Sequence, residues 1–324
     1  MKKIPPALTL FLLSPLLGEL ISGHLSPLEF FHPVRFVITV VPYGCGALIC
    51  REIVVRNQKG FLNLILAGIA FGLFFEGIIT RVIFNPQWVG LGALSSYDRF
   101  FGMNLILTVG IVHFHTLISI LSAILLTELL YPERKNESWV GYPVLVLCFI
   151  GLVSWIFLFG IIVSYNPPIE GIVVIFCLCT GLIILSMKIP AKIFSDDKEY
   201  KIHSVIFWLL GFLGMTLIMI GVYVLPQGGV HIPTVLYFFI LILIIITEFI
   251  LLIYLTKNGK NWSDHNCFYL IIGWLTFFLF LTAAQLFTGK SIVSFVTIIL
   301  FIRLKKKLNK RKLNSENHSS NNTI

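Results

Sequence analysis

Charged residues are scarce in this sequence. They make up 12% of its 324 residues, about half the ~25% that is usual in soluble domains. Hydrophobic residues make up 57%, and the mean hydropathy is +0.93. This composition excludes a water-soluble globular protein and a disordered chain. It predicts an all-α protein, a bundle of helices that crosses a membrane several times.

Cysteine is also sparse, and its placement argues against a disulfide framework. Nearly all of the six cysteines lie inside apolar runs. Cys177 and Cys179 are two residues apart, so they would point in different directions on a helix. We therefore expect small buried apolar residues rather than disulfides or metal ligands. The sequence assigns neither a metal nor a cofactor.

Apolar runs long enough to cross about 30 Å of hydrocarbon occur ten times. The predicted spans are 6–23, 36–55, 61–83, 104–130, 140–163, 171–188, 202–225, 233–256, 267–285 and 288–303. Only Phe287-Thr288-Gly289-Lys290 separates the last two, so one long broken segment is the alternative.

Lys and Arg are distributed unevenly between the segments that join these spans. If the N-terminus lies inside, all but four of the 24 Lys and Arg residues fall on inner segments. The four exceptions are Arg35, Arg81, Arg99 and Lys290. Cytoplasmic loops are enriched in positive charge. The pattern therefore predicts ten spans in the plasma membrane with both termini inside.

The net charge of +9 raises the alternative of a nucleic-acid partner. The densest positive cluster directly follows the last apolar run and comprises Arg303, Lys305, Lys306, Lys307, Lys310, Arg311 and Lys312. This position favours attraction to anionic lipids of the inner leaflet, at about 1 kcal/mol per residue near the surface. We expect a lipid partner for this tail and no nucleic acid.

Ionisable residues at membrane depth divide the chain into three parts. Residues 1–135 form a four-span part that contains most of them, residues 136–303 form an apolar six-span bundle, and residues 304–324 form the basic tail. A charge near the bilayer centre costs at least about 2.5–3.5 kcal/mol, so it usually faces protein or water. The first part is therefore the chemically interesting one.

Glu76 is the strongest of these residues as a site candidate. Gly68, Gly72, Glu76 and Thr80 recur every four residues and share one face of the third span. The two glycines form a GxxxG pair, which allows close approach of another helix. The stripe predicts that Glu76 points into protein. The alternative is a structural hydrogen bond to a neighbouring helix.

The fourth span adds two histidines on different faces. His115 belongs to a polar stripe with Asn104 and Thr108. His113 lies roughly 200° around the helix, among apolar residues, so the two do not share one metal on a regular helix. We favour His115 as the inward-facing histidine and keep His113 as a second candidate.

Glu19 in the first span lies at a similar depth. With a rise of 1.5 Å per residue, the levels of Glu19, Glu76 and His115 agree within about 8 Å. We predict an outward-facing pocket built from spans one, three and four, joined by Arg81 and covered by segment 84–103. Such a pocket suits acid–base chemistry, a divalent cation or a proton relay.

Three further glutamates have simpler interpretations. Glu52 is adjacent to Arg51 and four residues before Arg56, which predicts an ion pair at the membrane interface. Glu128 ends the fourth span and reaches water. Glu248 stands alone in the eighth span.

Two partial resemblances follow from these residues. Glu76-Gly77-Ile78-Ile79-Thr80-Arg81, followed by His113, resembles the E-E-x-x-x-R and F-x-x-x-H motifs of the CAAX-protease and bacteriocin-processing (CPBP) family. The resemblance implies an intramembrane protease in which Glu76 activates water, assisted by His113 or His115. Gly77 replaces the second glutamate, however, and no histidine follows in the next span.

The opening of the chain resembles a second group. Ser14-Pro15-Leu16-Leu17-Gly18-Glu19 and Ser26-Pro27-Leu28-Glu29-Phe30-Phe31 are similar to segments of uncharacterised prokaryotic multi-span membrane proteins. Three classes of function therefore stay open: binding or transport, intramembrane hydrolysis, and a packing role for the polar residues.

Overall fold

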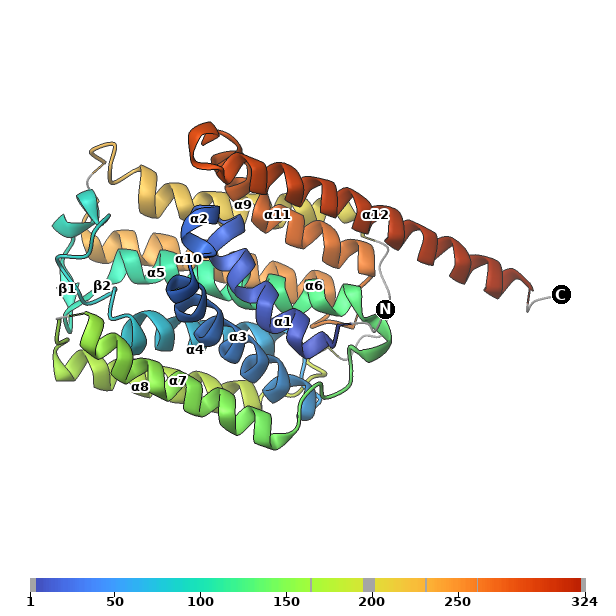
Figure 1. Ribbon diagram of the computed structural model, residues 1–324, viewed down its shortest axis with the longest axis horizontal. Coiled ribbons are helices and arrows are strands. Elements are labelled where there is room, and N and C mark those ends of the chain that lie inside the picture. Colours follow the sequence, from blue (N-terminus) through green and yellow to red (C-terminus); the bar gives the residue numbers. More distant parts are fainter. Residues whose placement is uncertain (1–3, 164, 195–201, 231, 261, 322–324) are drawn as a thin grey trace.

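The computed structural model describes residues 4–163, 165–194, 202–230, 232–260 and 262–321. Over these residues the chain forms ten helical rods that alternate in direction, as Figure 1 shows. The strands in the described ranges are β1 (Arg99–Phe100) and β2 (Met103–Asn104), which pair antiparallel in one short hairpin. The predicted all-α fold is confirmed.

Several rods combine α-helix with a π-helical segment. The first four are α1 (Pro6–Pro15) with η1 (Leu16–Ile21), α3 (Pro33–Arg56), α4 (Phe61–Leu73) with η2 (Phe74–Ile79), and α5 (Leu105–Phe114), η4 (His115–Ser122) and α6 (Ala123–Leu130) in line. The other six are α7 (Tyr142–Ile162), α8 (Ile169–Lys188), α9 (Ser204–Met219) with η6 (Ile220–Val224), α10 (Thr234–Thr256), α11 (Asp264–Ala283) and α12 (Lys290–Asn321). Short connecting helices are α2 (Pro27–Phe30), η3 (Gly92–Ser96), η5 (Pro132–Arg134) and η7 (Leu286–Thr288).

The rods coincide closely with the predicted spans. Eight are long and apolar enough to cross a membrane, whereas the first, Pro6–Ile21, is shorter and α12 is not among the eight. The last two predicted spans are separate helices, because the chain turns between them at Gly289 (φ 73°). A positive φ of this kind favours glycine. The count of ten spans stays a prediction.

Two ends of the bundle carry different loops. The Trp139 end, as we call it, comprises loops 57–60, 131–141 and 257–263, and the hydroxyl of Tyr131 there donates to the carbonyl of Ile4. The opposite Trp88 end carries segment 80–104. The start of α1 and the end of α12 both lie toward the Trp139 end in Figure 1. The predicted inner residues Lys2, Lys3, Lys198 and Lys201 lie outside the described residues.

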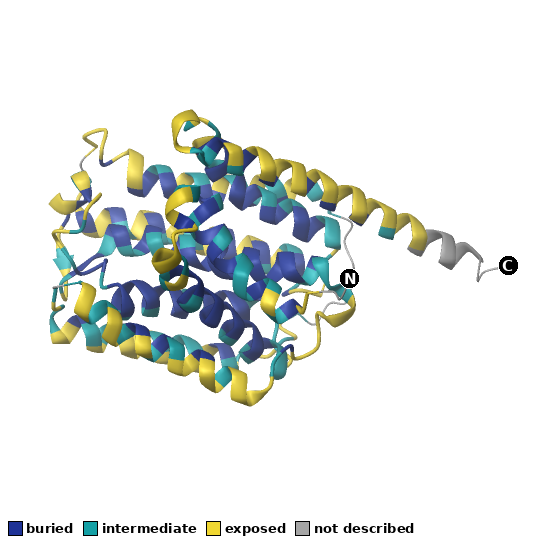
Figure 2. Cartoon of the chain, in the orientation of Figure 1, coloured by how far each residue is buried: buried dark blue, intermediate teal, exposed yellow. Residues whose placement is uncertain are grey.

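The rod α5–η4–α6 forms the centre of the molecule. Burial reaches 89% over its apolar window, compared with 17% for α7 and 22% for α8 and α10. Figure 2 shows the buried centre and the exposed outer rods. The outer rods expose large apolar side chains, which is the arrangement that lipid as a solvent favours. Helices of both halves of the chain share one apolar core.

Buried charge at the Trp139 end fixes loop 131–141. The predicted ion pairs of Glu52 are confirmed: its two carboxylate oxygens lie 3.0 Å from Arg51 Nη1 and 2.9 Å from Arg56 Nε. Glu52 also accepts hydrogen bonds from the Trp139 amide at 2.8 Å and the Ser138 hydroxyl at 2.5 Å. Glu52 is therefore fully enclosed by the protein.

Candidate functional site

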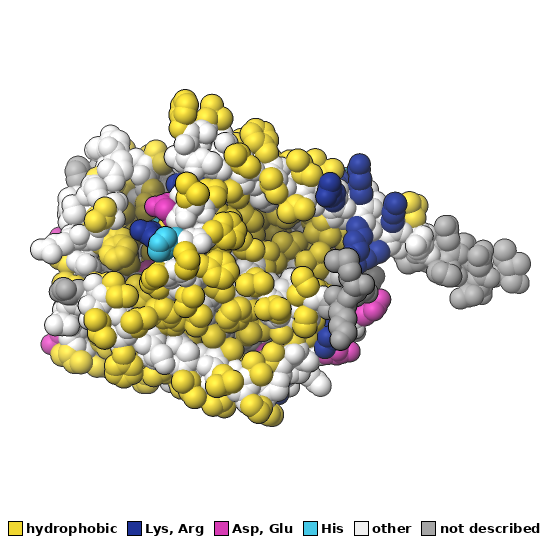
Figure 3. Space-filling model, viewed as in Figure 1, with side chains coloured by type: hydrophobic (Ala, Val, Ile, Leu, Met, Phe, Trp, Pro, Cys, Tyr) yellow, Lys and Arg dark blue, Asp and Glu magenta, His cyan; other side chains and the backbone are white. Residues whose placement is uncertain are grey.

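A cavity of about 540 Å³ lies toward the Trp88 end of the bundle. We call it the outer cavity. Its polar lining includes Glu19, Tyr43, Glu76 and His115, and the rest is mostly apolar, including Leu107, Ile111, Phe114, Phe277 and Phe278. Figure 3 shows the face crossed by α1 and α2, where a histidine lies beside acidic and basic side chains in a surface otherwise rich in hydrophobic ones.

Glu76 and His115 form a direct pair within the lining of the cavity. His115 Nε2 lies 2.6 Å from Glu76 Oε1, and Thr80 Oγ1 donates to Glu76 Oε2 at 2.8 Å. Both members of the pair are buried. A carboxylate partner favours the proton on Nε2. The pair is therefore able to hold and release a proton.

Ser119 completes the hydrogen bonding of His115. Its hydroxyl lies 3.1 Å from His115 Nδ1, so it can donate to the neutral imidazole. Ser119 is fully buried, and a Cβ added to Gly18 would lie 2.7 Å from its Oγ. Because η1 covers this hydroxyl, Ser119 orients the imidazole rather than facing the cavity.

Glu19 pairs with Tyr43, a residue that the sequence analysis missed. The Tyr43 hydroxyl donates to Glu19 Oε1 at 2.5 Å, and its ring centroid lies 5.5 Å from that of His115. Tyr43 therefore bridges the Glu19 side of the cavity and the Glu76–His115 pair. A tyrosine within an apolar span is the only sequence signal that points to it.

All four π-helical segments in the described ranges contribute a side chain to the outer cavity. They are η1 with Glu19, η2 with Glu76, η4 with His115 and η6 with Tyr223. A π-helix adds one residue per turn and occurs frequently at functional sites. Hydrophobic periodicity does not reveal such segments, so Tyr223 also escaped the sequence analysis.

The glycine stripe of the third span makes the predicted close helix contact. A Cβ on Gly68 would lie 3.0 Å from Thr116, and a Cβ on Gly72 would lie 3.2 Å from the Val112 backbone. These distances are tight for any larger residue. The glycines thus allow α4 and η2 to approach the central rod, which places Glu76 beside His115.

Arg81 does not join the outer cavity, contrary to expectation. η2 ends at Ile79, and Arg81 takes a left-handed conformation with φ 61°. Its guanidinium donates to the carbonyl of Tyr165 at 3.0 Å and lies against Gly160 of α7. The turn after the π-helix directs this side chain away from Glu76.

Asn104 and Thr108 are also absent from the cavity lining. The Asn104 side chain caps the start of α5, accepting from the amide of Leu107 at 3.0 Å and donating to the carbonyl of Leu94 at 2.7 Å. Thr108 donates to the carbonyl of Asn104 at 2.7 Å. Their stripe serves helix capping because polar side chains at a helix start satisfy free backbone groups.

Part of segment 84–103 covers the cavity. Trp88 and Leu91 line it, and the segment is held by Arg99, whose guanidinium donates to the carbonyls of Phe84 at 2.8 Å and Gly102 at 3.1 Å. Burial lowers the pKa of Arg99 from its usual value. Arg99 therefore holds the two ends of segment 84–103 together.

His113 lies on the other face of the central rod, toward α9, α10 and α11. Its Nε2 is 3.3 Å from Glu248 Oε2, and Trp274 Nε1 donates to Glu248 Oε1 at 3.0 Å. The sequence suggested that Glu248 stands alone. In the structure it is the centre of a second buried cluster. Gly214 makes room for it, since a Cβ there would lie 2.3 Å from the carboxyl carbon.

Neither cluster is a recognisable metal centre. Across the described ranges, no group of three or more His, Cys, Asp and Glu side chains is placed to hold a metal ion. The two histidines face different partners, as predicted from their spacing. The contacts at the two clusters are hydrogen bonds and close approaches between histidine and glutamate.

Comparison with known proteins identifies the family to which the chain belongs. No curated protein and no solved structure matches the sequence. The resemblance to the CPBP family is not shown by any match and stays a hypothesis. A family model described as an uncharacterised membrane protein family matches residues 8–305, nearly the whole chain. The chain therefore belongs to this uncharacterised family of membrane proteins.

Proposed function

We propose that the protein binds a small, largely apolar molecule with one cationic or hydrogen-bond-donating group, in the outer cavity. The observation that carries this proposal is the convergence of the four π-helical segments on that cavity. Each π-helix weakens regular hydrogen bonding at membrane depth, and ligand sites are a common place for such irregularity. A purely structural role for Glu76 does not require a cavity beside it.

The lining indicates the chemistry of the ligand. Glu19 and Glu76 supply two carboxylates, and the lining residues include no Lys or Arg. Ligand sites combine apolar walls with a few polar groups that fix orientation, and their volumes are typically about 300–1,000 Å³. A hydrophobic amine fits these features: its apolar part contacts Phe277 and Phe278, and its ammonium group faces the carboxylates.

The distribution of basic residues supports access from outside the cell. Apart from the four exceptions named above, the Lys and Arg residues that the structure describes belong to segments assigned to the Trp139 end or to the tail. The positive-inside rule then puts the Trp139 end in the cytoplasm of a plasma-membrane protein. The outer cavity faces the external solution in this orientation.

Thermal unfolding of the detergent-purified protein tests the proposal. Phenethylamine, phenethyl alcohol and phenylacetate share an aromatic ring and differ in the polar group. We expect phenethylamine to raise the melting temperature, with a weaker effect of the alcohol and none of the acid. Glu76→Gln should abolish the difference between amine and acid. Glu170→Gln, at the exposed start of α8, is the matched control and should retain it.

A result in which phenethylamine and a panel of secondary and quaternary arylalkyl amines leave the melting temperature unchanged overturns the proposal. Equal stabilisation by amine and acid also overturns it, because carboxylates in the cavity would then have no influence.

Intramembrane hydrolysis is the second candidate, and the 2.6 Å contact between Glu76 and His115 favours it. A carboxylate-supported imidazole is suited to take a proton from an attacking water. Peptide release from membrane-protein fragments, measured by mass spectrometry, would then be lost in His115→Ala. Amine binding without any such release favours the first candidate, and release without amine binding favours the second.

A further inference from the structure

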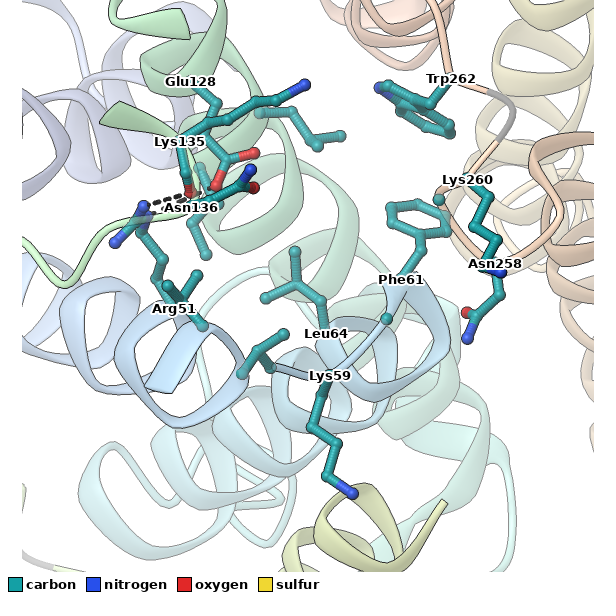
Figure 4. A pocket seen from close by; sticks show the side chains of 16 residues that line it. Arg51, Lys59, Phe61, Leu64, Glu128, Lys135, Asn136, Asn258, Lys260 and Trp262 are labelled. Carbon is teal, nitrogen blue, oxygen red and sulfur yellow. Dashed lines mark hydrogen bonds and ion pairs between the residues drawn. The ribbon is translucent and has the colours of Figure 1, made fainter. Parts of the chain in front are cut away.

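A second cavity lies at the Trp139 end, separate from the outer cavity. We call it the basic cavity. It occupies about 280 Å³ between the end of α3, the start of α4, the end of α6 and the loops that carry Lys135 and Lys260, as Figure 4 shows. One water needs only about 10–15 Å³ of such space. The basic cavity therefore has room for a group of several heavy atoms.

Positive charge predominates around the basic cavity. Its ionisable lining residues are Arg51, Lys59, Lys135, Lys260 and a single acid, Glu128. Glu128 Oε1 lies 3.4 Å from Arg51 Nε, so its charge is largely balanced by Arg51. Figure 4 shows Lys135 and Lys260 on opposite sides of the cavity. An anion between them would face two ammonium groups.

The Arg51 side chain in this lining is held in place by several contacts. It is fully buried, its guanidinium stacks 3.2 Å from the centre of the Trp139 ring, and its Nη atoms donate to the carbonyls of Lys135 and Glu137. Its Nε, which faces Glu128, has no hydrogen-bond partner among the described residues. The loop carrying Lys135 is thereby held at the rim.

The remaining residues that line the basic cavity are of the types common at a membrane interface. The rings of Phe61 and Trp262 lie 4.9 Å apart, and Leu64 and Ile124 continue the apolar side. Trp side chains commonly mark the level of lipid head groups. A basic rim above an apolar wall suits a phosphate group, whether it belongs to a lipid or to a soluble molecule.

We propose that the basic cavity binds a phosphate group, presented by an anionic phospholipid or by a soluble phosphate. The site is distinct from the basic tail on α12 and does not depend on the function proposed for the outer cavity. Basic pockets between membrane helices on the cytoplasmic side recognise lipid head groups by the same charge pairing.

Thermal unfolding in dodecyl maltoside tests this site with three probes: phosphatidylglycerol, phosphatidylcholine and inorganic phosphate at constant ionic strength. We expect phosphatidylglycerol or inorganic phosphate to raise the melting temperature by about 5 °C, which corresponds to roughly a hundredfold excess over the dissociation constant. A shift with phosphatidylglycerol alone identifies a lipid ligand. A shift with inorganic phosphate identifies the soluble source.

Two double variants separate the cavity from the tail. Lys135→Gln with Lys260→Gln should reduce the shift at least fivefold. Lys306→Gln with Lys310→Gln removes the same charge from exposed positions on α12 and should leave the shift unchanged. Lys260→Gln alone provides the test if the first double variant does not fold. Equal loss in both double variants, or no stabilisation of the unmodified protein by either phosphate source, overturns the proposal.

Discussion

His115 Nε2 lies 2.6 Å from Glu76 Oε1, and this contact joins the centre of the central rod to the π-helix at the end of α4. Two ionisable side chains at membrane depth thus satisfy each other beside a cavity. The same rod carries His113 to a second glutamate on its opposite face. Each histidine therefore links a different set of helices to the centre of the bundle.

Loss of the Glu76 carboxylate should destabilise the protein. Glu76→Ala leaves His115 Nε2 without its acceptor, whereas the Thr80 hydroxyl keeps the backbone carbonyl of residue 76. A buried unsatisfied polar group costs about 1–3 kcal/mol. Glu76→Gln retains a polar side chain of the same shape and should cost less. Thermal unfolding in detergent measures both, with Glu170→Ala as an exposed control. Equal stability of Glu76→Ala and the unmodified protein would contradict the structural importance of the contact.

The His113–Glu248 pair should show strong coupling in a double-mutant cycle. Removing one member leaves a polar atom of the other buried without a polar neighbour, which costs about 1–3 kcal/mol. Replacing both, as in His113→Leu with Glu248→Met, should cost much less than the sum of the single changes. The coupling energy follows from the unfolding free energies of the four proteins. Additive effects would show that the 3.3 Å contact contributes nothing of its own.

Hydrophobic length and helical periodicity were enough to predict most of this fold. The helix bounds agree with the predicted spans within a few residues, except that α12 continues to Asn321 beyond the predicted end at 303. The spacing of His113 and His115 correctly placed them on different faces. The Gly68–Gly72 pair also makes the expected close contact. These features follow from local repeats, which a single sequence contains.

Long-range contacts were the part that sequence alone did not reveal. The partners of Glu19 and Glu248 are Tyr43 and Trp274, 24 and 26 residues away, and no local pattern links them. Arg81 was misplaced because the π-helix and the left-handed residue after it change the direction of the side chain. Asn104 and Thr108 were misassigned because they lie at the start of α5. Their side chains bond to backbone groups there and do not line the cavity.

Arg51 should be irreplaceable by lysine. Its guanidinium contacts the Trp139 ring and two carbonyls of loop 131–141 at the same time, and an ammonium group lacks the planar fork needed for this. We expect Arg51→Lys to cost about 2 kcal/mol and to increase proteolysis within the loop. Arg134→Lys alters an exposed pair in that loop and should change little. Similar proteolysis of the two variants would argue against a special role for Arg51.

The orientation of the bundle leads to the last prediction. Fusion of alkaline phosphatase, which is active only outside the cytoplasm, after residue 90 should give activity, because this position lies in the cover of the outer cavity. Fusion after residue 135, at the Trp139 end, should give none, whereas a cytoplasm-dependent fluorescent protein at the same site should be bright. Fusions after residues 286 and 313 test the last crossing, because these two positions lie on opposite sides of the membrane only if α12 crosses it. Reversed signals at positions 90 and 135 would place the outer cavity in the cytoplasm and exclude a ligand supplied from outside.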